Sequence, residues 1–224
     1  MTFPQRLKQA ITWPLVFLFL MWAVFLLQNT IGGADWYTYG IAPRKTFAWR
    51  GIFLTPFLHG GWGHIISNSV PFFALMAMIL FFYPRVAVAV LLVIYLGTGV
   101  TMWAFADPEA LFSPYNRVNF HIGASGVVYG MASFLAFTGF FRRNIRAIAI
   151  SLVIIFYYGG MIWGVLPNQE GVSWEGHLLG AVVGIFAAYW FRQRIEQAEV
   201  RKKHAYELEE EEERYFLPRD TFKG

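Results

Sequence analysis

Ser125 and His177 are the residues of this chain whose types are best suited to covalent chemistry. Ser125 lies in a Gly-Ala-Ser-Gly segment at positions 123–126, and His177 directly follows a glycine. A serine hydroxyl is a weak nucleophile until a neighbouring base, such as imidazole, accepts its proton. The chain has 0 cysteines, which excludes disulfides, thiolate metal sites and cysteine nucleophiles. We therefore expect Ser125 to be a nucleophile and His177 to be its base.

A serine hydrolase also needs hydrogen-bond donors that stabilise the oxyanion formed during attack. His64 and Asn68 are four residues apart, so on a helix they share one face. We expect their side chains to donate, together with the amide of Ser125, because a helix start leaves amides free. The apolar segments contain no Asp or Glu that would orient His177. The sequence therefore predicts a Ser–His dyad and not a triad.

Small and aromatic residues near this pair predict how it is held. Tyr129 lies one helical turn after Ser125 and is expected to pack on the imidazole ring of His177. Glycines at four-residue spacing let membrane helices approach closely, although the same spacing also serves ordinary helix packing. The glycines expected to support the site are Gly123, Gly126, Gly180 and Gly184.

A metal site made of His59, His64 and His177 is the alternative use of the histidines. The spacing between His59 and His64 is poor for a helical pair, and metal-bound water would also need a carboxylate base. We therefore expect no metal and no cofactor. His59 is expected to be a structural hydrogen-bonding residue that fixes a long loop. His121 is expected to be a loop residue near the site, with a donor role as the alternative, and His204 is expected to have no role.

The composition indicates which environment surrounds these residues. Of the 224 residues, 57% are hydrophobic and only 14% are charged, whereas a soluble domain carries about 25% charged residues. The mean hydropathy is +0.45. These values predict a chain surrounded mainly by lipid, and the net charge of +4 is too small to indicate nucleic-acid binding.

A transmembrane helix needs about 20 mostly apolar residues, and six segments qualify. We therefore expect an all-α membrane protein with a bundle of six transmembrane helices. The expected division is a short N-terminus at 1–12, a catalytic domain at 13–192 and a charged, solvated tail at 193–224. The expected spans are Trp13–Ile31, Ile65–Tyr83, Val86–Phe105, Ser125–Phe141, Ala147–Val165 and Gly176–Phe191.

The basic residues predict the orientation, because cytoplasmic connections carry more Lys and Arg. One set of connections holds Arg6, Lys8, Arg85, Arg142, Arg143, Arg146, Arg192 and Arg194, whereas the other holds only Arg44, Lys45, Arg50 and Arg117. Both termini are therefore expected in the cytoplasm. The polar residues at the starts of the second, fourth and sixth spans then converge just below the extracytoplasmic surface.

These motifs together resemble the rhomboid family of intramembrane serine proteases. The resemblance runs from about Tyr39 to Arg192. The motifs that carry it are Gly40-Ile41-Ala42-Pro43-Arg44, the stretch Pro56–His64, Asn68, the Gly-Ala-Ser-Gly segment, and Gly176-His177-x2-Gly180-x3-Gly184. It implies a six-helix bundle whose water-filled cavity opens to the outer face. It also implies a flexible cap over the site, formed by the loop Gly164–Trp174.

The resemblance also implies roles and partners. Ser125 would be the nucleophile, and His177 the base and later the acid. His64 and Asn68 would be side-chain oxyanion donors, with backbone amides near Ala124 and Ser125 adding to them, and Tyr129 would stack beneath the histidine. The substrates would be transmembrane proteins, cut in or near their spans, in a cell membrane that is expected to be a prokaryotic plasma membrane.

Two other functions fit parts of this pattern. A non-catalytic rhomboid-like protein would bind transmembrane clients, but it would not require both Ser125 and His177. A transporter would have polar residues through the full depth of its spans, whereas here they cluster near one face. The sequence therefore favours an intramembrane serine endopeptidase.

Overall fold

The computed structural model of the chain describes residues 2–31, 34–107, 118–167 and 173–215. Within these ranges the regular structure is helical, apart from an isolated antiparallel bridge between Ile41 and His121. The predicted all-α fold is therefore confirmed for the described residues.

Each of the predicted spans falls on a helix. The long helices are α1 (Phe3–Thr30), α3 (Trp62–Phe82), α4 (Ala87–Phe105), α5 (Ser125–Arg142), α6 (Ile145–Tyr158), which continues as η5 (Gly159–Val165), and α7 (Trp174–Tyr215). The shorter ones are η1 (Ala34–Tyr39), η2 (Thr46–Ala48), α2 (Gly51–Leu54) and η3 (Thr55–Phe57).

Four helical segments of the described chain are long and apolar enough to cross a membrane: α1, α3, α4 and Ile145–Val165. Their outward faces expose large apolar side chains, including Phe19 at 71%, Val70 at 70% and Phe156 at 81%. Exposed apolar surface on this scale indicates contact with lipid. The chain is therefore a multi-pass membrane protein. That α5 and α7 also span the bilayer, giving six spans, stays a prediction.

The structure departs most from the predicted spans in three places. α1 begins at Phe3, because Thr2 and Gln5 form a capping box in which the Thr2 N–H donates to Gln5 Oε1 at 2.8 Å. In the fifth predicted span, α6 gives way to the 3-10 helix η5 at Gly159, where two successive glycines weaken the α-helix. The helix of the sixth predicted span, α7, continues through the charged tail to Tyr215. A search for apolar segments does not detect this extension.

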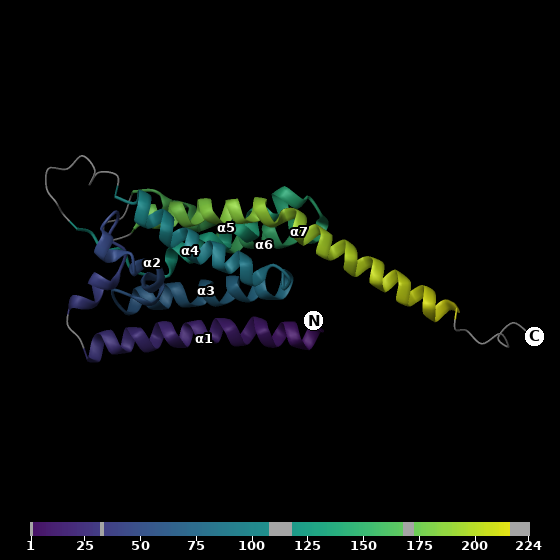
Figure 1. Ribbon diagram of the computed structural model, residues 1–224, viewed down its shortest axis with the longest axis horizontal. Coiled ribbons are helices and arrows are strands. Elements are labelled where there is room, and N and C mark those ends of the chain that lie inside the picture. Colours follow the sequence, from purple (N-terminus) through teal and green to yellow (C-terminus); the bar gives the residue numbers. More distant parts are fainter. Residues whose placement is uncertain (1, 32–33, 108–117, 168–172, 216–224) are drawn as a thin grey trace, which may run out of the picture.

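Figure 1 shows the arrangement of these helices. α3, α5 and α7 begin at the end of the bundle that holds α2, while the N-terminus and the extension of α7 leave at the opposite end. The first residues of α1 and the last residues of α7 therefore lie on the same side of the bundle (Figure 1). Which side faces the cytoplasm stays a prediction.

Helix α5 is the centre of the bundle and packs against α3, α4, α6 and α7. Its contact with α7 is a backbone contact made through glycines. A Cβ atom on Gly180 would overlap the Gly126 carbonyl, and one on Gly184 would overlap the Gly130 carbonyl. The glycine stripes therefore bring the two helices that carry Ser125 and His177 as close as helices can pack.

Candidate active site

A tight turn presents Ser125 as the first residue of α5. Gly123 has a φ of 110°, a region that glycine adopts far more easily than other residues. A Cβ atom on Gly123 would lie only 2.5 Å from His64 Nε2. The Gly123 N–H donates to the Thr55 carbonyl at 2.9 Å. The glycine therefore allows both the turn before the serine and the close approach of His64.

Two side chains of α3 approach this turn. His64 Nδ1 accepts a long hydrogen bond of 3.5 Å from the Gly60 N–H, which assigns the ring proton to Nε2, the nitrogen nearest Gly123. Asn68 is 5% exposed, and its Nδ2 is buried without a hydrogen-bond partner among the described residues. Both side chains therefore offer N–H donors beside the first turn of α5.

His177 is held by a backbone carbonyl and an aromatic ring. Its Nδ1 lies 2.8 Å from the Gly164 carbonyl oxygen. A carbonyl only accepts, so Nδ1 carries the ring proton and Nε2 is left as the basic nitrogen. The ring stacks on Tyr129 with centroids 4.2 Å apart and an interplanar angle of 8°. The Tyr129 hydroxyl donates to the Met161 carbonyl at 2.8 Å, so η5 holds both rings.

One cavity joins these groups. It has a volume of about 670 Å³ and is lined by residues that include His64, Asn68, Ser125, Tyr129 and His177. No hydrogen bond joins Ser125 to the His177 ring within the described part of the chain. Catalytic hydrogen bonds are often long in the absence of substrate and shorten only in its complex. The arrangement can thus perform nucleophilic attack once the two side chains meet.

His59 lies behind the cavity. It is 2% exposed, its N–H donates to Gln28 Oε1 at 3.3 Å, and its ring packs edge-on against His64 at 5.0 Å. Burial, with a smaller contribution from the charge of His64, lowers the pKa of His59 to about 4. A neutral His59 therefore connects the loop before α3 to α1. The described residues contain no group of His, Asp and Glu that could hold a metal ion.

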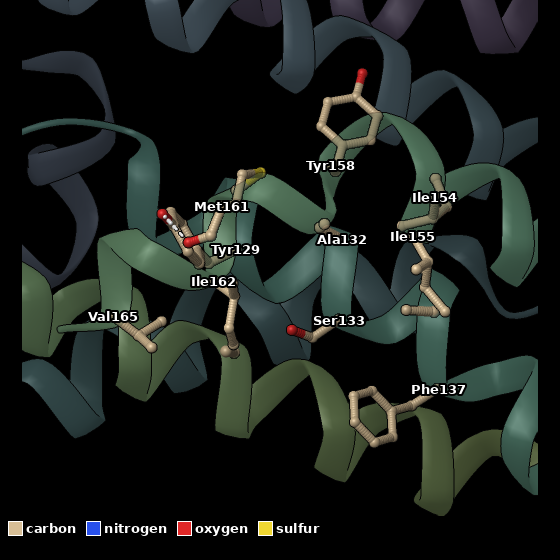
Figure 2. Close-up of a pocket in the computed structure, with 13 residues that line it drawn as sticks. Tyr129, Ala132, Ser133, Phe137, Ile154, Ile155, Tyr158, Met161, Ile162 and Val165 are labelled. Atoms are coloured by element: carbon tan, nitrogen blue, oxygen red, sulfur yellow. Dashed lines mark hydrogen bonds between the residues drawn. The ribbon is translucent and has the colours of Figure 1, made fainter.

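A second, apolar pocket lies beside the cavity. It has a volume of about 170 Å³ and is lined by residues of α5, α6 and η5 and by Ala181 of α7. Figure 2 shows Ser133, Ile155 and Phe137 around it and Tyr129 at one side, with the bond from Tyr129 to Met161 dashed. Tyr129, Tyr158 and Met161 line both spaces. The tyrosine that supports His177 therefore separates a polar cavity from an apolar one.

Two groups in the cavity were not identified from the sequence. They are the Gly164 carbonyl and Ser173, which lie at the two ends of the predicted cap; residues 168–172 between them lie outside the described ranges. Every residue has a carbonyl, so no residue type indicates that of Gly164. The serine of the Ser-Trp-Glu-Gly segment did carry a signal, because serine often caps a helix.

Comparison with known proteins gives one family and several relatives. Residues 46–194 match the Rhomboid domain. The chain is 36% identical over 179 residues to an uncharacterized protein of Mycobacterium tuberculosis, covering 78% of this chain and 72% of that protein. An uncharacterized protein of Mycobacterium leprae is 34% identical over 179 residues, covering 78% and 68%. The matched domain contains every residue that lines the cavity, from Gly60 to His177.

Proposed function

The chain belongs to the rhomboid family, and from that premise we propose that it is an intramembrane serine endopeptidase that acts through a Ser125–His177 dyad. Members of the family are generally intramembrane serine proteases. The observation that carries the proposal is the shared cavity. A nucleophile, a base with its Nε2 free and two N–H donors line it, on helices that pack backbone to backbone.

The first half of the reaction forms an acyl-enzyme. Ser125 Oγ bonds to the carbonyl carbon of the scissile peptide while His177 Nε2 takes the hydroxyl proton. The developing oxyanion accepts hydrogen bonds from His64 Nε2 and Asn68 Nδ2 and from a backbone amide near Ala124. The C–N bond then breaks, and the amine leaves with the proton that His177 held.

The second half returns the enzyme to its starting state. A water molecule attacks the ester carbon and gives a proton to His177 Nε2, and the bond to Ser125 Oγ breaks as that proton returns to the serine. Throughout, Nδ1–H stays bonded to the Gly164 carbonyl, and the carbonyl dipole stabilises the imidazolium. A backbone carbonyl thus takes the place that a carboxylate has in a triad.

The substrates in this proposal are membrane proteins cut in or near a transmembrane segment. A helical backbone hides its carbonyls in internal hydrogen bonds, so the substrate must unwind locally. Glycine or proline near the cut favours that unwinding, and a small residue at the cut suits the tight turn at Gly123. The neighbouring apolar pocket provides space for a hydrophobic side chain of the unwound segment.

The proposed location is a prokaryotic plasma membrane, with both termini in the cytoplasm and the cavity open to the extracytoplasmic side. The basic residues on the connections support this orientation. The mycobacterial relatives support the prokaryotic assignment. Fusion of a reporter that is active only in the cytoplasm to each terminus tests the orientation directly.

Cleavage of a fluorescent transmembrane substrate in liposomes tests the function. The wild type should cleave it, and the Ser125→Ala protein, folded to the same extent, should not. Equal cleavage by both proteins would contradict the proposed nucleophile. Binding of the substrate without cleavage by either protein would favour the non-catalytic client-binding function, because the retained dyad would then have no chemical role.

A further inference from the structure

Ser173, His121 and Asp107 form a second group of serine, histidine and carboxylate, apart from the proposed dyad. His121 Nδ1 is 2.7 Å from Ser173 Oγ, and His121 Nε2 is 3.2 Å from Asp107 Oδ2. The His121 side chain is 8% exposed and that of Asp107 is 14% exposed. The second distance is that of an ion pair, and its angle falls short of a well-aligned hydrogen bond. The group therefore links the loop after α4 to the start of α7.

The hydrogen bonds of this group run in one direction. Ser173 Oγ accepts the Gly176 N–H at 3.3 Å, so its own hydroxyl proton is free for His121 Nδ1. Because Nδ1 accepts this proton, the ring proton lies on Nε2, the nitrogen 3.2 Å from the Asp107 carboxylate. Burial raises the pKa of Asp107, but its interactions with His121, Asn119 and Arg44 outweigh burial and hold that pKa below its usual range. Asp107 is thus a fixed negative charge that orients the His121 ring.

The backbone of His121 is fixed as firmly as its ring. It exchanges two hydrogen bonds with Ile41, of 2.8 and 3.0 Å. Its carbonyl also accepts from the Thr55 hydroxyl at 3.3 Å. A Cβ atom on Gly40 would lie 2.5 Å from the same carbonyl oxygen. His121 is therefore anchored to the first loop and offers Ser173 a rigid partner.

The positions of the two partners relate them to the dyad. His121 is four residues before Ser125, and Ser173 is four residues before His177. Ser173 also caps the first turn of α7, where its carbonyl accepts the His177 N–H at 3.2 Å. The dyad side chains are not bonded to each other. The His121–Ser173 bond therefore joins the starts of α5 and α7 where the dyad does not.

We propose that His121 is a positioning residue, which through Ser173 sets the separation between Ser125 and His177. The inference rests on the proposed function. The glycine contacts at Gly126 and Gly130 hold the helices together deeper in the bundle, and the His121–Ser173 bond holds them at the level of the reacting atoms. Ser173 is not a nucleophile in this account, because its oxygen is already engaged by Gly176 and His121.

Matched variants separate the effect of the His121–Ser173 hydrogen bond from the effect of side-chain size. His121→Leu and His121→Asn have nearly the same shape, but only Asn keeps a polar group within reach of Ser173. Ser173→Ala removes the bond from the other side, and Ser173→Thr keeps the hydroxyl. For each protein we would measure the rate at which a fluorophosphonate labels Ser125, and kcat and KM for a transmembrane substrate.

His121→Leu and Ser173→Ala should each lower the labelling rate and kcat about tenfold, because each loses one buried hydrogen bond. KM should stay within about twofold, because a positioning role acts on the reacting groups and not on ground-state binding of the substrate. His121→Asn and Ser173→Thr should keep most of the wild-type labelling rate and kcat. Unchanged labelling in folded Ser173→Ala would overturn the proposal, and so would a fluorophosphonate adduct on Ser173.

A distance measurement tests the same bond without any activity. Because the chain has 0 cysteines, Val118→Cys and Leu178→Cys give a unique pair for spin labels; both side chains are exposed. The distance distribution between the labels should be narrow and should broaden with Ser173→Ala or His121→Leu. Broadening in a protein that neither labels nor cleaves would reject the protease function while keeping the positioning role. An unchanged distribution would reject the positioning role.

Discussion

Two serine–histidine pairs lie within the described part of the chain, and they differ in almost every respect. Ser173 and His121 are bonded at 2.7 Å, with Asp107 at the other ring nitrogen. Ser125 and His177 share a cavity without a bond between them, and His177 is held by a carbonyl and a stacked tyrosine. The pair that looks more like a catalytic triad lies in the loops. The pair that is proposed to react lies between the helices.

This difference shows that residue types alone do not identify a nucleophile. The hydroxyl of Ser173 is engaged in a helix cap, so attacking a substrate would cost that hydrogen bond. The hydroxyl of Ser125 has no such bond and faces a cavity with two N–H donors. A rigid pair is suited to positioning and a loose pair, with its surroundings fixed, is suited to reaction.

The largest expected effect separates the two serines. Ser125→Ala and His177→Ala should each reduce cleavage at least about 10⁴-fold, because each removes a group that takes part in bond making. Ser173→Ala should lose only about tenfold. Cleavage assays on the three proteins, with thermal unfolding as the folding control, measure the contrast. Similar losses of cleavage for Ser125→Ala and Ser173→Ala would contradict the assignment of different roles to the two serines.

The next effect concerns the carbonyl that orients His177. A Cβ atom on Gly164 would overlap the Tyr129 hydroxyl and lie 3.2 Å from His177 Nδ1, whereas one on Gly160 meets nothing within 4 Å. Gly164→Ala should lower kcat about 10²-fold, because a small displacement of the base is costly. Gly160→Ala, in the same 3-10 helix, should be near wild type. Equal kcat values would show that η5 does not position His177.

A third effect tests the packing beneath the dyad. Gly180→Val should lower the unfolding temperature and the rate of Ser125 labelling, because its side chain meets the Gly126 backbone. Gly63→Ala, also in a helix, meets nothing within 4 Å and should change neither. Thermal scans with labelling rates compare the two. A stable, active Gly180→Val protein would mean that the glycine contact does not hold the dyad helices together.

The smallest effect is a pH dependence of stability from His59. Its folded pKa of about 4 is below the ordinary value of about 6.5, so the unfolded state binds more protons below pH 6.5. The stabilisation is complete above about pH 6.5 and is lost as the pH falls through about 4. His59→Asn should flatten this dependence. A wild-type unfolding temperature constant over that range would contradict a buried, neutral His59.

The sequence was sufficient for the family and for most of the helices. The rhomboid resemblance is confirmed by the domain match, and each apolar segment falls on a helix. The helix ends were less predictable. The start at Phe3 depends on a capping box, and the extension to Tyr215 is made of charged residues that no apolar window detects.

The site was predictable where residue types carry the chemistry. Ser125, His177, His64 and Asn68 stood at helix starts in the sequence, and the structure brings all of them to one cavity; their roles stay predictions. The Gly164 carbonyl has no residue-type signal. The His121–Ser173 bond joins residues 52 positions apart, and only the packing of α5 against α7 brings them together.

The most direct test of the account is the position of a fluorophosphonate adduct on the purified protein, mapped by peptide mass spectrometry. We expect one modified serine, Ser125. The adduct should disappear in His177→Ala and persist at a reduced rate in Ser173→Ala. An adduct on Ser173, or labelling of Ser125 that does not depend on His177, would contradict the claim that the cavity pair is the catalytic one.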